Sequence, residues 1–281
     1  MRRALPAAAP TQTISRVHPG KEKNVAYKNI LTEVRDGVLV VTINREERRN
    51  AINPETAAEM EACLNDAEKD AAIGAIIITG AGEKSFCAGE DLAAYDENGS
   101  CQTIMEHGFA GITERLSSKP IICAANGTAV GGGLEIALAC DVIVAADTAR
   151  FGFPEVKIGF LATSGGLIRL PKSIPHKIAS EMMLSGKLIE AKRAYEVGLI
   201  NYMVPYAEVM PKAMEIASLI AANAPISLKL TKQILHMAQQ MSFEDAQRYC
   251  NICWDYIEKT EDAKEGPQAF LEKRKPEWKG R

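Results

Sequence analysis

Short apolar runs separated by polar loops occupy the first two thirds of the chain. We expect four of them to be strands, because they are rich in β-branched residues and bounded by glycine, proline, asparagine or aspartate. These are GVLVVTIN (37–44), AIIITG (75–80), PIICAANG (120–127) and DVIVAA (141–146). AIIITG shows no alternation of apolar and polar positions, which is typical of a strand buried on both faces.

Apolar residues at helical spacing lie between these runs. Asn53 and Pro54 predict a helix start, with asparagine as the cap and proline at the first helical position, and Met60 and Leu64 follow at helical spacing. Further helices are expected for IMEHGFAGITERLSS (104–118) and GGLEIALAC (132–140). Strands that alternate with helices predict an α/β fold.

From about residue 211 only helical segments remain. They are KAMEIASLIAANA, ISLKLTKQILHMAQQ, SFEDAQRYCNICWDYI and EDAKEGPQAFLEKR. A small region could not bury all of their apolar stripes alone, so we expect them to pack against the core or another subunit. We therefore divide the chain into an extension (1–26), a core domain (27–210) and a helical C-terminal region (211–281).

Residues 1–26 contain Arg2, Arg3 and Arg16 but lack the long apolar stretch of a secretory signal. We expect a flexible extension and a cytoplasmic location; a transit peptide here would instead indicate mitochondria. The formal net charge of −3 gives no footprint for nucleic acid or an anionic membrane, and no apolar run approaches the roughly 18–20 residues of a membrane span. We therefore expect neither nucleic acid nor a membrane as a partner.

The sequence also narrows the chemistry. Seven cysteines scattered through apolar stretches indicate buried thiols, and the Cys250–Cys253 pair lacks the second ligand pair of a zinc site. We expect no metal. TGAGEKS (79–85) lacks the spacing of a phosphate loop, and Gly131–Gly133 is not a dinucleotide fingerprint because position 136 is isoleucine. Ser164, in ATSGG, lacks the flanking glycine of the GxSxG motif that positions the nucleophile of serine hydrolases. With none of these motifs present, any catalysis is expected to depend on carboxylate side chains.

Two glutamates are the candidates. Glu135 falls in the first turn of the helix that the triple glycine begins, where unpaired N–H groups and a positive dipole end are expected. Glu155 follows a short predicted strand and Pro154. Taken singly, Glu135 is equally explained as a complement to the helix dipole, and Glu155 as a surface carboxylate.

Three ordered motifs resemble the enoyl-CoA hydratase/isomerase, or crotonase, superfamily: KSFCAGEDL (84–92), ANGTAVGGGLEIALACDVIVAA (125–146) and ARFGFPEVKIGFLATSGGLIRLP (149–171). The likeness runs from about residue 27 to the C-terminal helices, and SGGLIRLPKSIP is also similar to carnitinyl-CoA dehydratases. The resemblance implies stacked ββα units in two sheets, a C-terminal region that builds trimers or hexamers, and an acyl-CoA thioester substrate. It implies no cofactor, since coenzyme A is part of the substrate.

The resemblance also implies site residues. The backbone N–H groups of Gly132 and Glu90 would form an oxyanion hole for an enolate. Glu135 would mainly orient and activate water, while Glu155 would mainly deliver a proton to Cα. The substrate or CoA would contact Ala51, Ala88, Glu90, Asp91, Leu92, Gly131 and Gly132.

Some positions depart from the family pattern. Glu90 stands where a small or apolar residue is common, so its carboxylate could alter substrate choice. Asp91 is better suited to cap the following helix. A lysine of mitochondrial-type hydratases corresponds to Ala93. Arg45, Arg48 and Arg49 could bind the CoA phosphates or could simply be solvated charges. Phe160, Leu161 and the helix around 102–115 could line an acyl pocket.

We therefore expect an enoyl-CoA hydratase that adds water reversibly and syn to a 2-enoyl-CoA. The alternatives are a Δ3-Δ2 enoyl-CoA isomerase, which needs one carboxylate, a carnitinyl-CoA dehydratase-like lyase, and a non-catalytic acyl-CoA- or RNA-binding protein. The presence of both glutamates favours hydration.

Overall fold

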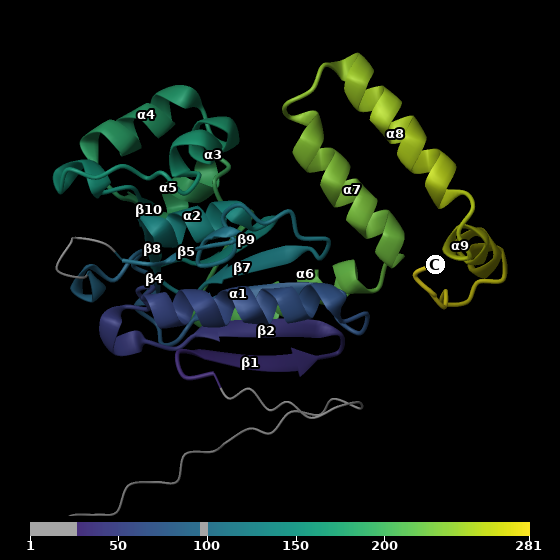
Figure 1. The fold of residues 1–281 in the computed structure, drawn as a ribbon, viewed down its shortest axis with the longest axis horizontal. Coiled ribbons are helices and arrows are strands. Elements are labelled where there is room, and N and C mark those ends of the chain that lie inside the picture. The colour runs from purple at the N-terminus through teal and green to yellow at the C-terminus, as the bar shows by residue number, and fades with distance from the viewer. Residues whose placement is uncertain (1–26, 96–100) are drawn as a thin grey trace, which may run out of the picture.

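Two β-sheets lie at the centre of the computed structural model, which describes residues 27–95 and 101–281 (Figure 1). The expected extension, residues 1–26, lies outside the described residues. The larger sheet has the order β1 (Ile30–Arg35), β2 (Val38–Ile43), β3 (Ala75–Gly80), β7 (Ile121–Ala125), β9 (Val142–Ala146) and β12 (Tyr202–Val204). The smaller has the order β11 (Ile189–Glu190), β10 (Arg150–Gly152), β8 (Thr128–Val130) and β4 (Ser85–Cys87).

Helices cover these sheets and continue beyond them. They are α1 (Pro54–Lys69), α2 (Gly132–Ala139), α3 (Gly166–Ser173), α4 (His176–Ser185), α5 (Ala191–Glu196), α6 (Tyr206–Ala221), α7 (Pro225–Ala238), α8 (Phe243–Ile257) and α9 (Asp262–Leu271). Three short 3-10 turns are η1 (Glu46–Arg48), η2 (Leu92–Ala94) and η3 (Glu155–Lys157). Helix α2 packs on β4 and β8 of the smaller sheet, and α6 packs on β3, β7 and β9 of the larger.

The strand and helix predictions in the core are largely confirmed. All four expected strands are present as β2, β3, β7 and β9, and from β2 to β12 the neighbouring strands of the larger sheet are parallel. Every residue of β3 is buried, as its unbroken apolar run predicted. Asn53 caps α1, because its Oδ1 accepts a hydrogen bond from the N–H of Thr56 at 2.8 Å.

The predicted helix over 104–118 is wrong. The segment instead forms a hairpin of β5 (Ile104–Met105) and β6 (Gly108–Phe109), followed by turns. Gly108, Ala110 and Gly111 all have positive φ angles, which no right-handed helix contains. A methyl group at Gly111 would lie 2.6 Å from Oε2 of Glu61, so contact with α1 fixes this turn.

The C-terminal segments are helical, as predicted. In Figure 1, α7 and α8 run side by side and project away from the sheets. The expected boundary between residues 210 and 211 falls inside α6, which packs on the larger sheet. The projecting part therefore begins at α7.

Two further sequence expectations concern the cysteines and membrane-spanning helices. All seven cysteines lie in the described part of the chain, and none is joined in a disulfide. Within residues 27–95 and 101–281, no single helix is long and apolar enough to cross a bilayer; α6 and α7 meet that test only as a pair, and they are bent by 109°.

Candidate active site

The triple glycine is explained by how tightly the start of α2 is packed. Gly131 precedes the helix with φ of 56° and ψ of −133°. A methyl group at Gly133 would lie 2.0 Å from the carbonyl oxygen of Cys87 in β4, closer than any carbon approaches an oxygen without bonding. Glycine therefore lets the N-terminus of α2 pack directly against β4. We call the residues that follow this strand, Ala88 to Asp91, the AGED loop.

The two N–H groups of the predicted oxyanion hole lie on adjoining stretches of backbone. A methyl group at Gly89 would lie 3.0 Å from the nitrogen of Gly132. The bridge between Ile52 and the AGED loop uses the carbonyl of Gly89 and the N–H of Asp91, and leaves the N–H of Glu90 outside this pairing. The N–H of Gly132, in the first turn of α2, has no acceptor within its own helix. Both N–H groups are thus available at one place.

Glu135 is buried beside this turn, with 4% of its surface exposed. Its Oε1 accepts a hydrogen bond from the N–H of Gly166, at the start of α3, at 2.9 Å. Burial, together with the charge of Glu155, raises the pKa of Glu135 to about 7, although the bond from Gly166 favours the ionised form. A carboxyl group with this pKa can exchange a proton near neutral pH.

Glu155 approaches the same turn from another segment. It follows β10 and Pro154 and begins η3. A methyl group at Gly131 would lie 3.2 Å from its Oε1. Its Oε2 is buried and has no hydrogen-bond partner among the described residues, and burial raises the pKa of this carboxyl. The structure therefore brings Glu135 and Glu155 together beside the turn that precedes α2.

A buried ion pair holds the AGED loop. The Arg45 guanidinium lies 2.8 Å from Oδ2 of Asp91 and donates to the carbonyl oxygen of Ala51 at 2.5 Å. The other carboxylate oxygen of Asp91 accepts from the N–H of Ala93 at 3.2 Å, which confirms the predicted cap on η2. Arg45 is therefore engaged within the protein, whereas Arg48 is exposed.

The remaining predicted contacts surround this loop. Ala88 donates its N–H to the carbonyl oxygen of Arg49 at 3.1 Å, and the side chain of Arg49 is exposed. The side chains of Leu92, Phe160 and Leu161 are 55%, 45% and 64% exposed. The segment 102–115 reaches the site without being a helix.

Phe109 makes that contact. A methyl group at Gly132 would lie 2.6 Å from the Phe109 ring. In the same segment, Arg115 donates to Glu61 Oε1 at 3.0 Å, in a cluster that also contains Glu106 and His107. Because a guanidinium already supplies positive charge there, this cluster supports the turn rather than a metal ion.

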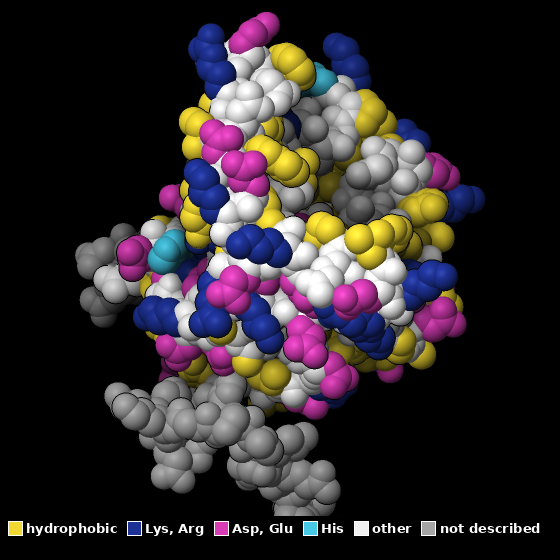
Figure 2. Space-filling model, turned by 90° about the vertical axis from the view of Figure 1, so that its right-hand side faces the viewer, with side chains coloured by type: hydrophobic (Ala, Val, Ile, Leu, Met, Phe, Trp, Pro, Cys, Tyr) yellow, Lys and Arg dark blue, Asp and Glu magenta, His cyan; other side chains and the backbone are white. Residues whose placement is uncertain are grey.

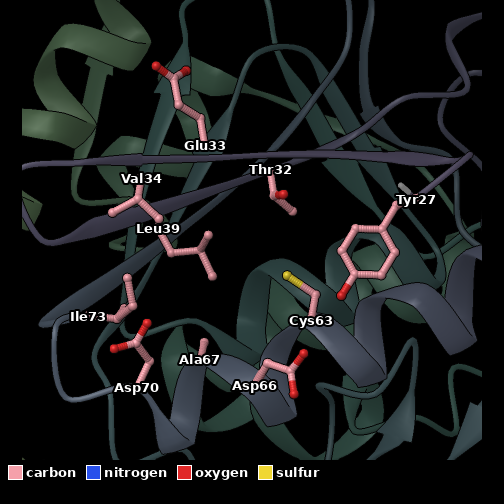
Figure 3. Close-up of a pocket in the computed structure, with 10 residues that line it drawn as sticks. All are labelled: Tyr27, Thr32, Glu33, Val34, Leu39, Cys63, Asp66, Ala67, Asp70 and Ile73. Carbon is pink, nitrogen blue, oxygen red and sulfur yellow. The ribbon is translucent and has the colours of Figure 1, made fainter. Parts of the chain in front are cut away.

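Two hollows differ in their relation to the glutamates. The one in Figure 3 has a volume of about 70 Å³ and lies between α1 and the hairpin β1–β2, away from both. The other, of about 250 Å³, lies between α3 and the end of α7 and is lined by residues that include Ser164, Gly165 and Arg169. Gly165 precedes Gly166, the residue that donates to Glu135, so this hollow lies near Glu135.

Sequence reasoning missed several of these partners. The contacts of Gly166 with Glu135, of Arg169 with the carbonyl oxygen of Thr113, and of Arg45 with Asp91 were not expected, because each joins segments far apart in the chain. The only local signal was the glycine pair in SGGLIRLP, where Gly165 has a φ of 102° and permits the tight start of α3.

Comparison with known proteins gives a consistent result. The family model for enoyl-CoA hydratase/isomerase matches residues 33–281. Carnitinyl-CoA dehydratase from Escherichia coli K12 is 42% identical over 250 residues, covering 87% of this chain and 95% of that protein. The crystal structure of an enoyl-CoA hydratase from Mycobacterium tuberculosis superposes with a TM-score of 0.86 at 38% identity, covering 90% and 99% of the two chains.

A carnitinyl-CoA hydratase from Mycobacterium avium, also a crystal structure, gives a TM-score of 0.72 at 40% identity, covering 90% and 99% of the two chains. These matches extend over nearly all of the described chain and include the three motifs around the glutamates. The protein is therefore an enzyme of the enoyl-CoA hydratase/isomerase (crotonase) family, with the α/β fold of that family and its lyase-type chemistry on acyl-CoA thioesters.

Proposed function

We propose that this enzyme is an enoyl-CoA hydratase, which adds water reversibly and syn across the double bond of a 2-enoyl-CoA. The observation that carries this proposal is the pair of buried glutamates, Glu135 and Glu155, beside the start of α2. Hydration needs one group to accept a proton from water and another to give a proton to Cα. A pair of carboxyl groups whose pKa values are raised toward neutrality can do both.

The mechanism follows from these positions. The N–H groups of Glu90 and Gly132 bind the thioester oxygen and stabilise the negative charge it gains as the enolate forms. Glu135 orients water and accepts its proton while the oxygen bonds to Cβ. Glu155 delivers a proton to Cα, and the thioester carbonyl is restored. The two carboxyl groups share this proton traffic and titrate as a pair.

No metal ion or redox cofactor takes part in this proposal, because every step is a proton transfer or the addition of water. Coenzyme A enters as part of the substrate. The exposed Arg48 and Arg49 side chains are the candidates to meet its phosphates, since Arg45 is committed to Asp91.

A second candidate is the dehydration of a hydroxyacyl-CoA of the carnitinyl type, favoured by the 42% identity to carnitinyl-CoA dehydratases. The same glutamates would then run the elimination. Isomerisation is less favoured, because a single carboxyl group suffices for it and this site contains two.

Loss of the ultraviolet absorbance of crotonyl-CoA tests the proposal. We expect hydration by the wild type, and a fall in kcat of roughly 10²–10⁴-fold in Glu135→Gln and in Glu155→Gln, which is the usual range for losing a general acid or base. Glu181→Gln on exposed α4 is the matched control and should keep the wild-type rate. Wild-type turnover in both active-site variants would refute the assignment.

A further inference from the structure

The side chain of Arg169 folds back over the turn that holds Glu135. Glu135 accepts the N–H of Gly166 at 2.9 Å, and the backbone of Ser164 also bonds to it. Arg169 lies in the same helix, α3, and its Nη1 is 3.5 Å from the carbonyl oxygen of Ser164. A methyl group at Gly165 would overlap this Nη1, so the missing side chain leaves room for the guanidinium. The guanidinium therefore covers the turn from which Glu135 takes its hydrogen bonds.

The other end of the guanidinium reaches the segment that packs on the oxyanion hole. Nη2 of Arg169 donates to the carbonyl oxygen of Thr113. The hydroxyl oxygen of Thr113 accepts the N–H of Phe109 at 2.8 Å. The Phe109 ring in turn packs on Gly132, where a methyl group would lie 2.6 Å from it. One side chain thus joins the turn that binds Glu135 to the hairpin that packs on a proposed oxyanion donor.

Arginine is suited to this position by its shape and its charge. The planar guanidinium presents its N–H groups in a fixed fork, so it can bind carbonyl oxygens on two segments at once, whereas a lysine ammonium is a single compact charge. The charge also acts on Glu135. Burial raises the pKa of Glu135 most strongly, and the positive charge of Arg169 acts in the opposite direction. Arg169 therefore favours the ionised form of the proposed base.

We propose that Arg169 is a positioning residue, which holds Glu135 and the oxyanion hole at the correct separation for the addition of water to the thioester. It acts through the 163–166 turn and through Phe109 rather than on the reacting atoms. This inference rests on the proposed hydration and adds a residue to it. A misplacement of about 1 Å at such a site can cost about 10²-fold in rate.

Replacing the guanidinium tests this role. Arg169→Met removes the fork and the charge but keeps an apolar stem, and we expect kcat with crotonyl-CoA at its alkaline plateau to fall roughly 10²-fold. Binding of butanoyl-CoA, which has no double bond to hydrate, should stay close to wild type in calorimetry. Arg169→Lys, which keeps the charge without the fork, should recover only part of kcat. Lys172→Met removes an exposed cation from the same helix and is the matched control.

The pH profile separates positioning from a general loss of structure. In Arg169→Met the acid midpoint of kcat/KM should move to higher pH, because Glu135 loses a charge that favours its ionised form. It should return toward the wild-type midpoint in Arg169→Lys and stay there in Lys172→Met. The variants leave unchanged the other ionisable groups that act on Glu135 or Arg169 or line the adjoining hollow, which are Glu155 of η3, Glu114 of the 102–115 segment, Cys140 after α2 and His236 of α7.

Unfolding free energies provide a readout that needs no catalysis. At pH 8 the gain in stability from Glu135→Gln should be larger in the Arg169→Met background than in the wild type, because the folded protein then holds the Glu135 proton more tightly. If crotonyl-CoA is not hydrated but this difference is present, the proposed function fails and the link between Arg169 and Glu135 stands. If crotonyl-CoA is hydrated, the inference is overturned when Arg169→Met keeps the wild-type kcat, or loses kcat with the midpoint and the unfolding gain unchanged. Neither hydration nor the difference in unfolding would overturn both.

Discussion

The protonation of a single side chain, Glu135, sets the pH range in which the enzyme should work. Its pKa is raised to about 7, first by burial and then by the charge of Glu155. In the proposed mechanism the ionised form accepts the proton from water, so we expect kcat/KM for hydration to fall on the acid side, with a midpoint near pH 7. A pH profile with crotonyl-CoA measures this, and an acid limb centred near 4.5, the ordinary value, would contradict it.

The same raised pKa should weaken the fold at alkaline pH. The folded protein holds the Glu135 proton more tightly than the unfolded chain does, so stability falls as the pH rises from about 4.5 to about 7. Glu135→Gln removes this charge and keeps an oxygen to accept from Gly166. We expect the variant to be more stable than the wild type at pH 8, by up to about 3 kcal/mol, and the gain to vanish near pH 4.5.

Denaturant unfolding at both pH values measures that difference. Glu181→Gln, which removes an exposed carboxylate, should change stability little at either pH. A gain for Glu135→Gln that is equal at the two pH values would assign it to packing rather than to the proton.

At this scale the proposed reacting groups could be identified from the sequence, but the residues that hold them in place could not. Glu135, Glu155 and Gly132 could be predicted because each lies within a local motif. The bond from Gly166 to Glu135 could not, because it joins residues 31 positions apart and depends on how α3 packs against α2. The hydrogen bond from the Thr103 hydroxyl to the Glu90 carboxylate was missed for a further reason, because Thr103 belongs to a segment that looked helical.

Among the structural elements, the loop between β4 and η2 is the one that the ion pair holds in place. Asp91→Ala would leave the buried Arg45 charge unpaired, which typically costs about 3–5 kcal/mol. Since this loop carries the N–H of Glu90, we expect both a lower Tm and a lower kcat with crotonyl-CoA. Asp91→Asn keeps the acceptor for Ala93 and should lose less of both.

Thermal unfolding and steady-state kinetics on the two variants check this prediction. If Asp91→Ala unfolds at the wild-type temperature and retains wild-type kcat, the ion pair does not position the loop.

Elements could be predicted where the local pattern and the tertiary structure agree. The runs that became β2, β3, β7 and β9 are apolar because they are buried in the sheet. Strand β1 was missed, although Asp36 and Gly37, both with positive φ, form the two-residue turn that joins it to β2. The helix prediction for segment 104–118 failed because its apolar spacing fits a helix, while Gly108 and Gly111 adopt left-handed conformations. Gly111 lies against the distant Glu61 of α1, a contact that the local sequence does not reveal.

At the scale of the whole molecule, the projecting helices α7, α8 and α9 leave many large apolar side chains exposed. Their exposed large side chains are Leu235, Phe243, Ile252, Trp254, Tyr256, Phe270 and Leu271. Figure 2, viewed from the side on which these helices project, shows hydrophobic side chains at the surface among charged ones. We propose that other copies of this chain cover them in a trimer or a pair of trimers.

Phe270 offers the sharpest test of that assembly, because it is 83% exposed at the end of α9. Burying a phenylalanine side chain contributes about 1.5–3 kcal/mol, so Phe270→Asp should remove this contribution in each subunit and place a charge in the contact. Sedimentation velocity should show a trimer or hexamer for the wild type and smaller species for the variant. Gln247→Asp adds the same charge to an exposed position of α8 as the control and should leave a larger fraction assembled. A wild type that sediments as a monomer would mean that the apolar faces of these helices serve some purpose other than self-association.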